Sequence, residues 1–176
     1  MRPRTPEIVA GVMVLAVCLV SYGLTLAPTI TWEHDGVDSG DLITAAYTAG
    51  VAHPPGYPLF VMLAKLFSLL PLGEVAFTVN LMSALCGAST AVIIFCTVLQ
   101  LIPGRTDTPF AVLVATASAL LFAFAETFWS QAVIAEVYTL NALLVAGAIL
   151  LATLYRVTPD RKLLWLLGLM LGLSLA

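Results

Sequence analysis

The sequence predicts an all-α membrane protein, a bundle of about five transmembrane helices joined by short connections. The chain is 61% hydrophobic and 10% charged, with a mean hydropathy of +1.05. A soluble domain carries about 25% charged residues, so this composition cannot build a water-exposed surface. The apolar residues also gather in long runs, and most of the carboxylates lie between the runs.

The first apolar run, residues 8–26, follows Arg2 and Arg4 and has the length of a membrane span. It is too long for the apolar core of a secretory signal, and Pro28 and Trp32 follow it rather than a small-residue cleavage site, so we expect it to be retained. Four more spans are predicted, at residues 75–102, 109–125, 132–155 and 163–176. The last amounts to roughly 21 Å of helix, short of a bilayer core, so we expect the chain to be part of a longer protein that need not be active without the rest.

The basic residues set the expected orientation. With a cytoplasmic N-terminus, the five spans place every basic residue except Lys65 on the cytoplasmic side, as the positive-inside rule requires. These residues are Arg2, Arg4, Arg105, Arg156, Arg161 and Lys162. The same arrangement makes the 27–74 loop extracytoplasmic.

The 27–74 loop holds the main candidate residues, because four acids and both histidines lie between residues 33 and 53. Ser39 is expected to cap a short helix over about 40–49, with Asp41 in its first turn and Gly50 at its end. The apolar segment 57–70 is too short to span, so we expect it in the outer interface, with Lys65 reaching toward headgroups. Two short interfacial helices would thus hold the acids at the membrane boundary.

Carboxylates at such a boundary could act as general bases toward a hydroxyl, as metal ligands or as solvated charge. The position of the acids at a helix start, with His53 beside the stiff Pro54-Pro55 pair, favours an organised site. Glu33 and Asp35 are expected to be solvated. The carboxylates lack a fixed ligand spacing, so no metal residues are assigned and a divalent cation stays open.

A second candidate region enters the predicted fourth span from the outer side. Trp129 marks the boundary, and Glu136 follows inside the span. A carboxyl within a membrane helix is a functional hypothesis by default, and the alternative is a buried carboxyl that bonds to a neighbouring helix. Asn80 and Asn141 are expected to join helices through hydrogen bonds.

The cysteines and the basic residues narrow the possible classes of function. Cys18, Cys86 and Cys96 lie in apolar runs without metal-ligand or redox spacing, so we expect them to be packing residues. The basic residues are scattered and the net charge is −3, which excludes a nucleic-acid surface.

Three blocks of the sequence carry a resemblance to a known family: VDSGDLITAAYTAGVAHPPGYPLF, VNLMSALCGA and TFWSQAVIAEVYTLNAL. In this order they resemble a widespread family of bacterial membrane proteins whose animal relatives are endoplasmic-reticulum protein O-mannosyltransferases. An Asp at the head of the first outer loop, followed by a Pro-Pro turn, is more distantly similar to the C-type glycosyltransferases (GT-C). The resemblance implies a GT-C-like bundle in the bacterial cytoplasmic membrane, which transfers a mannose-like sugar from a polyprenyl-phosphate carrier to a hydroxyl of a protein or glycan.

The resemblance also suggests roles for single residues. Asp38 matches the family's first-loop carboxylate, and we expect it to be the general base of an inverting displacement. Asp41 could bind the acceptor, the sugar or a metal, or could simply stabilise the helix start. His53 and Lys65 are the candidates to face the lipid phosphate, although each also has a purely structural interpretation. Glu136 could reach the same centre.

Two further classes of function stay open on the residues alone, a transporter and a noncatalytic assembly subunit. A transporter places its substrate near the midplane, often between repeated halves, whereas this chain shows no internal repeat and its polar residues crowd one side. An assembly subunit would not explain the organised acidic loop.

Overall fold

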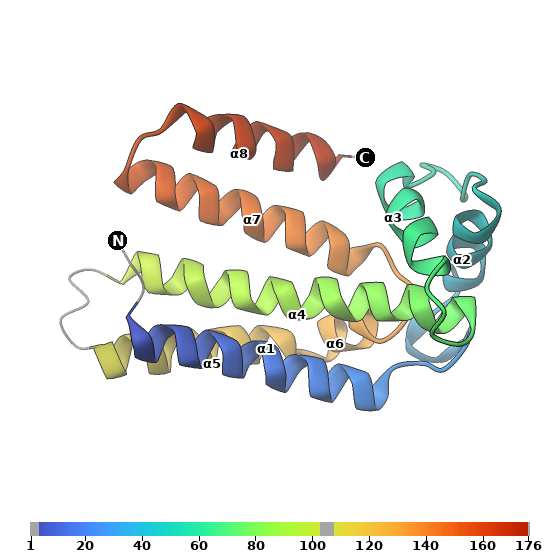
Figure 1. Ribbon diagram of the computed structural model, residues 1–176, viewed down its shortest axis with the longest axis horizontal. Helices are drawn as coiled ribbons and strands as arrows, with labels where there is room; N and C mark the ends of the chain where they lie inside the picture. Colours follow the sequence, from blue (N-terminus) through green and yellow to red (C-terminus); the bar gives the residue numbers. More distant parts are fainter. Residues whose placement is uncertain (1–3, 103–107, 176) are drawn as a thin grey trace.

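The computed structural model describes residues 4–102 and 108–175, and its longer helices run side by side along one axis (Figure 1). The bundle consists of α1 (Thr5–Thr25), α4 (Val75–Leu101), α5 (Thr108–Ala123), α7 (Tyr138–Val157) and α8 (Arg161–Leu173). The short elements at one end are η1 (Glu33–Asp35), α2 (Ser39–Thr48), α3 (Pro58–Ser68) and α6 (Glu126–Ala132). The described residues form no strand, so the all-α prediction is confirmed.

Three helices are long and apolar enough to cross a membrane: α1 with 21 residues, α4 with 27 and α7 with 20. The helices α5 and α6 meet at an angle of 68° and add a fourth crossing if they form one broken span. The chain is therefore a multi-pass membrane protein. We predicted about five spans, and the described residues supply three or four, because α8 has only 13 residues.

The predicted span 132–155 is wrong at its start. Helix α6 ends at Ala132 and α7 begins only at Tyr138, so Glu136 lies in a non-helical linker rather than in a membrane helix. The linker is apolar apart from Glu136, and hydropathy alone therefore cannot detect the break. Residues outside the linker form hydrogen bonds with its backbone in place of helical ones. Ala27 N donates to Val133 O at 2.9 Å, and Glu136 N donates to Ser83 Oγ at 3.3 Å.

Helix α4 lies at the centre of the bundle and packs against α1, α3, α5, α6 and α7. Its buried residues are mostly Ala, Gly, Ser and Thr, which allow neighbouring backbones to approach closely. A Cβ added at Gly87 would lie 3.1 Å from Ala132 Cβ and 3.2 Å from Tyr22 Cε2. The helices α1, α4 and α6 therefore meet at this glycine.

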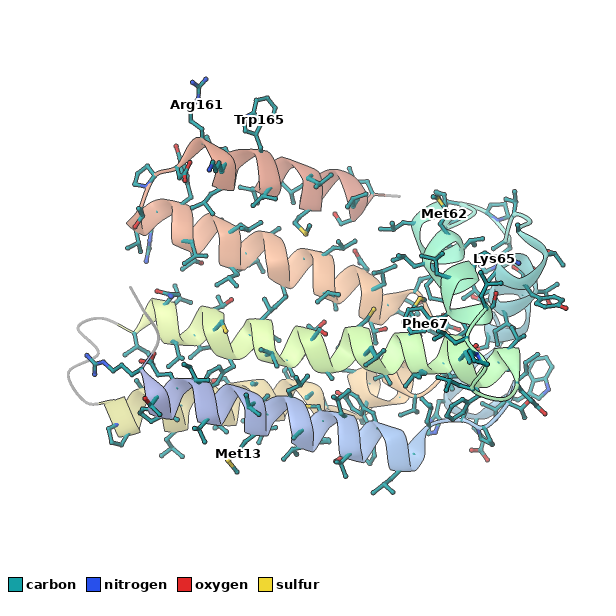
Figure 2. The ribbon with its side chains drawn as sticks, viewed as in Figure 1. Met13, Met62, Lys65, Phe67, Arg161 and Trp165 are labelled. Atoms are coloured by element: carbon teal, nitrogen blue, oxygen red, sulfur yellow. The ribbon has the colours of Figure 1, made fainter. Side chains whose placement is uncertain are left out.

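Large apolar side chains cover the outside of the bundle. Met13 is 60% exposed and Trp165 is 76% exposed, and Figure 2 shows both projecting away from the neighbouring helices. Helix α3 exposes Met62 and Leu66 and is too short to span, as predicted. Apolar surface of this extent is stable only when lipid covers it.

The two ends of the bundle differ in charge. Where α1 begins and α7 leads into α8, the described cations are Arg4, Arg156, Arg161 and Lys162. This end also carries Glu7 and Asp160, whereas Lys65 and the other described carboxylates lie at the opposite end. The separation agrees with the expected arrangement of loops, and the predicted orientation across the membrane stays a prediction. Arg2 and Arg105, which entered that prediction, lie outside the described residues.

The polar residues Asn80 and Asn141 do not make the helix-to-helix hydrogen bonds that were expected of them. Asn80 was expected to join two helices, but its Nδ2 donates to Ala27 O at 2.8 Å and to Thr29 O at 3.3 Å, in the loop after α1. Asn141 is exposed on α7. Cys18 and Cys86 are buried in the core, in agreement with a packing role.

We expect the variant Gly87→Leu to destabilise the bundle by about 1–3 kcal/mol, because the added side chain overpacks the meeting point of three helices. The variant Gly23→Leu is the matched control, since no atom lies within 4 Å of a Cβ added at Gly23 of α1. Thermal unfolding in detergent micelles measures both. Equal melting temperatures for the two variants would contradict the close approach at Gly87.

Candidate functional site

Helix α2 carries two carboxylates at its start. It begins at Ser39 with Asp38 in the N-cap position, and Leu42 N donates to Asp38 O at 3.0 Å. Ser39 was expected to cap the helix, but its buried Oγ has no hydrogen-bond partner among the described residues. The side chain of Asp38 makes no cap hydrogen bond either and is 52% exposed. Its carboxylate is therefore accessible to a substrate.

The other end of α2 closes one residue earlier than predicted. Ala49 takes the left-handed conformation with φ 54°, and Gly50 N donates to Ala45 O at 2.8 Å, as in a Schellman motif. Gly50 was expected to end the helix, and the left-handed residue is instead Ala49. A Cβ at Gly50 would lie 3.1 Å from Thr48 Oγ1, so the glycine serves close packing instead.

A tight turn brings His53 back to the start of α2. The turn runs from His53 to Gly56 and is closed by a bond of 2.8 Å from Gly56 N to His53 O. The Pro54–Pro55 peptide bond is cis and Gly56 has φ 98°, which together give a type VI turn that ends in a glycine conformation. The sequence HPPG thus fixes the direction in which His53 points.

The imidazole of His53 lies between the two carboxylates of α2. Asp41 Oδ2 accepts from His53 N at 2.8 Å and lies 2.8 Å from His53 Nδ1, so one oxygen serves both groups of the histidine. On the opposite side of the ring, His53 Nε2 lies 3.6 Å from Asp38 Oδ2. The ring of Tyr57 packs edge-on at 5.4 Å between centroids. Asp41 therefore orients His53, and His53 faces Asp38.

These contacts shift the acid–base behaviour of both partners. The hydrogen bond from His53 N, then the bond from the ring, lower the pKa of Asp41 below its usual value. The hydrogen bond to Asp41 raises the pKa of His53, and the charges of Asp38, Asp41 and Glu136 add to this effect. The pair therefore favours a carboxylate beside an imidazolium.

Glu136 approaches this group from the linker before α7. It is only 4% exposed. Burial, followed by the negative charge of Asp38, raises the pKa of its carboxyl to about 7, while a hydrogen bond from the Val137 backbone and the charge of His53 act in the opposite direction. Glu136 thus interacts electrostatically with both Asp38 and His53.

Lys65 lies at the other end of α2 from the carboxylates. Its Nζ donates to Tyr47 O at 2.6 Å and stands 5.6 Å from the centre of the Tyr47 ring. Asp41 and Tyr47 are separated by about 9 Å along the helix axis. The amine, labelled in Figure 2, therefore satisfies a C-terminal carbonyl of α2.

The other described acids of the loop, Glu33 and Glu74, are both exposed. Glu33 is exposed in η1, in agreement with a solvated role, and the side chain of Asp35 lies outside the described part of the structure. Within residues 4–102 and 108–175, no three His, Cys, Asp or Glu side chains are arranged to hold a metal ion. No metal ligand is therefore assigned.

Two contacts of the site region were not predicted from the sequence. Tyr57 supports the His53 ring, and the only signal for it is the tyrosine that directly follows HPPG. Gln131 Nε2 donates to His34 O at 3.0 Å and thereby ties α6 to η1. That contact joins residues 97 positions apart, which no local pattern can reveal.

Comparison with known proteins identifies the class of this membrane bundle. The family described as "Protein O-mannosyl-transferase TMEM260 N-terminal domain" matches residues 38–176. The chain belongs to this family. No solved structure matches the chain.

Two curated relatives carry the same description. "Protein O-mannosyl-transferase TMEM260" of Mus musculus is 41% identical over 143 residues, which cover 81% of this chain and 19% of the relative. "Protein O-mannosyl-transferase tmem260" of Dictyostelium discoideum is 31% identical over 147 residues, which cover 82% of this chain and 17% of the relative. The chain therefore spans about a fifth of the length of the curated relatives it matches.

We expect Asp41→Asn to lower the pKa of His53 toward its usual value of 6.5, because the hydrogen bond to the carboxylate is the main cause of the upward shift. Protonated His53 stabilises the folded protein. This contribution to the free energy of unfolding is complete below pH 6.5 and is lost as the pH rises through the raised pKa of His53. The stabilisation from ionised Asp41 is present above its usual 3.8 and is lost as the pH falls through its lowered pKa.

Nuclear magnetic resonance titration of histidine-labelled protein in detergent measures the His53 pKa directly. Glu33→Gln is the control, because Glu33 is an exposed carboxylate of the same loop and is not among the groups that shift the pKa of His53. An unchanged His53 pKa in Asp41→Asn would show that the contact does not form in solution.

Proposed function

We propose that the chain forms the catalytic loop and the adjoining membrane helices of an inverting glycosyltransferase. It would transfer mannose from a polyprenyl-phosphate carrier to a hydroxyl group of an acceptor protein. The observation that carries this proposal is the accessible Asp38 carboxylate beside an oriented His53, in a chain that belongs to the family of an O-mannosyl-transferase domain.

The proposed reaction needs one base. Asp38 accepts the proton of the acceptor hydroxyl while the hydroxyl oxygen attacks the anomeric carbon of the sugar. The bond between that carbon and the phosphate oxygen breaks, and the polyprenyl phosphate leaves with the electron pair. A direct displacement inverts the anomeric centre and does not need the second, nucleophilic carboxylate of retaining enzymes.

Asp38 suits the role of base better than Asp41. Asp41 Oδ2 already accepts from the backbone and lies against the ring of His53, and these bonds lower its pKa and weaken it as a base. Asp38 makes no cap hydrogen bond and is half exposed. We therefore assign Asp41 to the positioning of His53.

His53 supplies positive charge next to the base. As an imidazolium it has N–H groups on both sides of the ring, one toward Asp41 and one toward Asp38. This charge also suits the phosphate that leaves the sugar, because charge-assisted hydrogen bonds stabilise developing negative charge. Lys65 bonds the far end of α2, and we leave it out of the reacting group.

Glu136 adds a second acidic group behind the base. Its pKa of about 7 means that it exchanges a proton near neutral pH, in part because Asp38 is charged. We propose that Glu136 keeps the electrostatic balance of the site when Asp38 gains a proton. When Asp38 is protonated, its negative charge no longer acts on Glu136, and the carboxyl of Glu136 then ionises more readily.

The proposed reaction takes place on the extracytoplasmic side of a bacterial cytoplasmic membrane. In this orientation the end with Arg156, Arg161 and Lys162 faces the cytoplasm, and the loop with Asp38 faces outward. A donor sugar on a lipid carrier then meets the site from the outer leaflet, while a protein acceptor approaches from the water.

The bend between α5 and α6 is the feature that would favour a transporter, since transporters place substrates at broken helices. Such sites lie near the membrane midplane. The titratable group of Asp38, Asp41, His53 and Glu136 lies instead at one end of the bundle, which favours chemistry at the membrane surface.

Asp38→Asn in the full-length protein should reduce sugar transfer by at least about 100-fold, because the loss of a general base removes about 10²–10⁴ in rate. The assay follows radiolabelled mannose from polyprenyl-phosphate mannose to acceptor protein in membranes. Glu33→Gln should retain the parental rate, since Glu33 is exposed outside the group. Transfer by Asp38→Asn at the parental rate, with normal membrane insertion, would exclude Asp38 as the base.

A further inference from the structure

A cleft lies at the end of the bundle that carries α2, among the end of α1, η1 and α6. We call it the α6 cleft, and its volume is about 650 Å³. Its polar lining consists of Thr25, His34, Glu126, Thr127, Ser130 and Gln131. This volume lies within the roughly 300–1,000 Å³ that is usual for ligand sites.

Contacts among its own residues hold the walls of the α6 cleft in place. The indole N–H of Trp129 donates to Thr25 Oγ1 at 3.1 Å, and Phe124 packs edge-on against Trp129 at 6.0 Å between centroids. On the other wall, Gln131 Nε2 donates to His34 O at 3.0 Å. A cleft with fixed walls binds a ligand without first ordering its side chains.

The lining of the α6 cleft suits a neutral or cationic ligand rich in hydrogen-bonding groups. It offers hydroxyl and amide groups and the carboxylate of Glu126, and it contains neither Lys nor Arg. A lipid phosphate therefore finds no permanent cation there. The groove of about 500 Å³ beside α3 differs, because Lys65 stands among mostly apolar residues such as Val61 and Met62.

The α6 cleft lies close to the proposed base along the chain. His34 precedes Asp38 by four residues, so their Cα atoms are separated by at most about 14 Å. An extended polypeptide covers the same distance with about four residues. A peptide that places a serine or threonine hydroxyl at Asp38 can thus reach the cleft with its neighbouring residues.

We propose that the α6 cleft binds the acceptor polypeptide on one side of the residue that receives the sugar. This inference rests on the proposed function. In it, Thr127, Ser130 and Gln131 bond the peptide, and Glu126 favours acceptors with a lysine or arginine within about four residues of the hydroxyl. The cleft would therefore set which hydroxyl groups are modified, without a part in the chemical step.

The test fills the cleft without altering the reacting group. Thr127→Trp places a large ring in the cleft, and Thr29→Trp is the matched control, because Thr29 is an exposed threonine at the same end that does not line the cleft. The full-length protein is assayed with polyprenyl-phosphate mannose and two acceptors. One is a nine-residue peptide with a single central threonine and a lysine four residues away on either side, and the other is a single threonine with blocked ends.

We expect the parental protein and Thr29→Trp to show a KM for the peptide about tenfold below that for the blocked threonine. Thr127→Trp should raise the peptide KM by about tenfold or more and leave both the donor KM and transfer to the blocked threonine unchanged. Parental transfer to the blocked threonine also shows that the variant is folded. Glu126→Gln should reduce the preference for the lysine peptide over one with glutamate in place of lysine.

Two outcomes would overturn the inference and leave the proposed function intact. In the first, the parental protein transfers mannose and Thr127→Trp has the same peptide KM as the parental protein. In the second, Thr127→Trp raises only the KM for the donor. If the parental protein transfers mannose to neither acceptor nor to any acceptor protein, the proposed function itself fails.

Discussion

The double contact between Asp41 and His53 is the interaction on which the site depends. A single carboxylate oxygen binds both the backbone N–H and the ring of His53, at 2.8 Å each, and so joins the start of α2 to the HPPG turn. Without this link, the imidazole of His53 would lose the hydrogen bond that orients it and holds its Nε2 beside Asp38. Asp38, one turn earlier, makes no cap hydrogen bond and is 52% exposed.

The membrane explains why the polar chemistry is gathered at one end. Apolar helices satisfy their own backbone groups and leave little room for charge in the hydrocarbon, so charged side chains are favoured where the chain meets water. The break after Ala132 obeys the same constraint, since Ala27 and Ser83 form hydrogen bonds with backbone groups of the linker that have no partner within a helix. Glu136 thereby stays buried near the site, outside the membrane helices.

The helices and the group of loop residues could be predicted because their signals are local. Long apolar runs indicate α1 and α4, and the acidic stretch before HPPG indicates α2 and the position of Asp38. The break before α7, the end of α2 at Ala49 and the partner of Lys65 could not be predicted in the same way. Each depends on contacts with distant backbone groups or on small differences in packing, which hydropathy and residue spacing do not record.

The most direct measurement is a cryo-electron microscopy structure of the full-length protein with an acceptor peptide and a phosphonate analogue of polyprenyl-phosphate mannose, in which a carbon replaces the bridging oxygen. We expect the acceptor hydroxyl within about 3 Å of the Asp38 carboxylate, with the anomeric carbon on its far side and Asp41 still bound to His53. A hydroxyl placed against another base, or a donor bound at the opposite end of the bundle, would contradict this expectation.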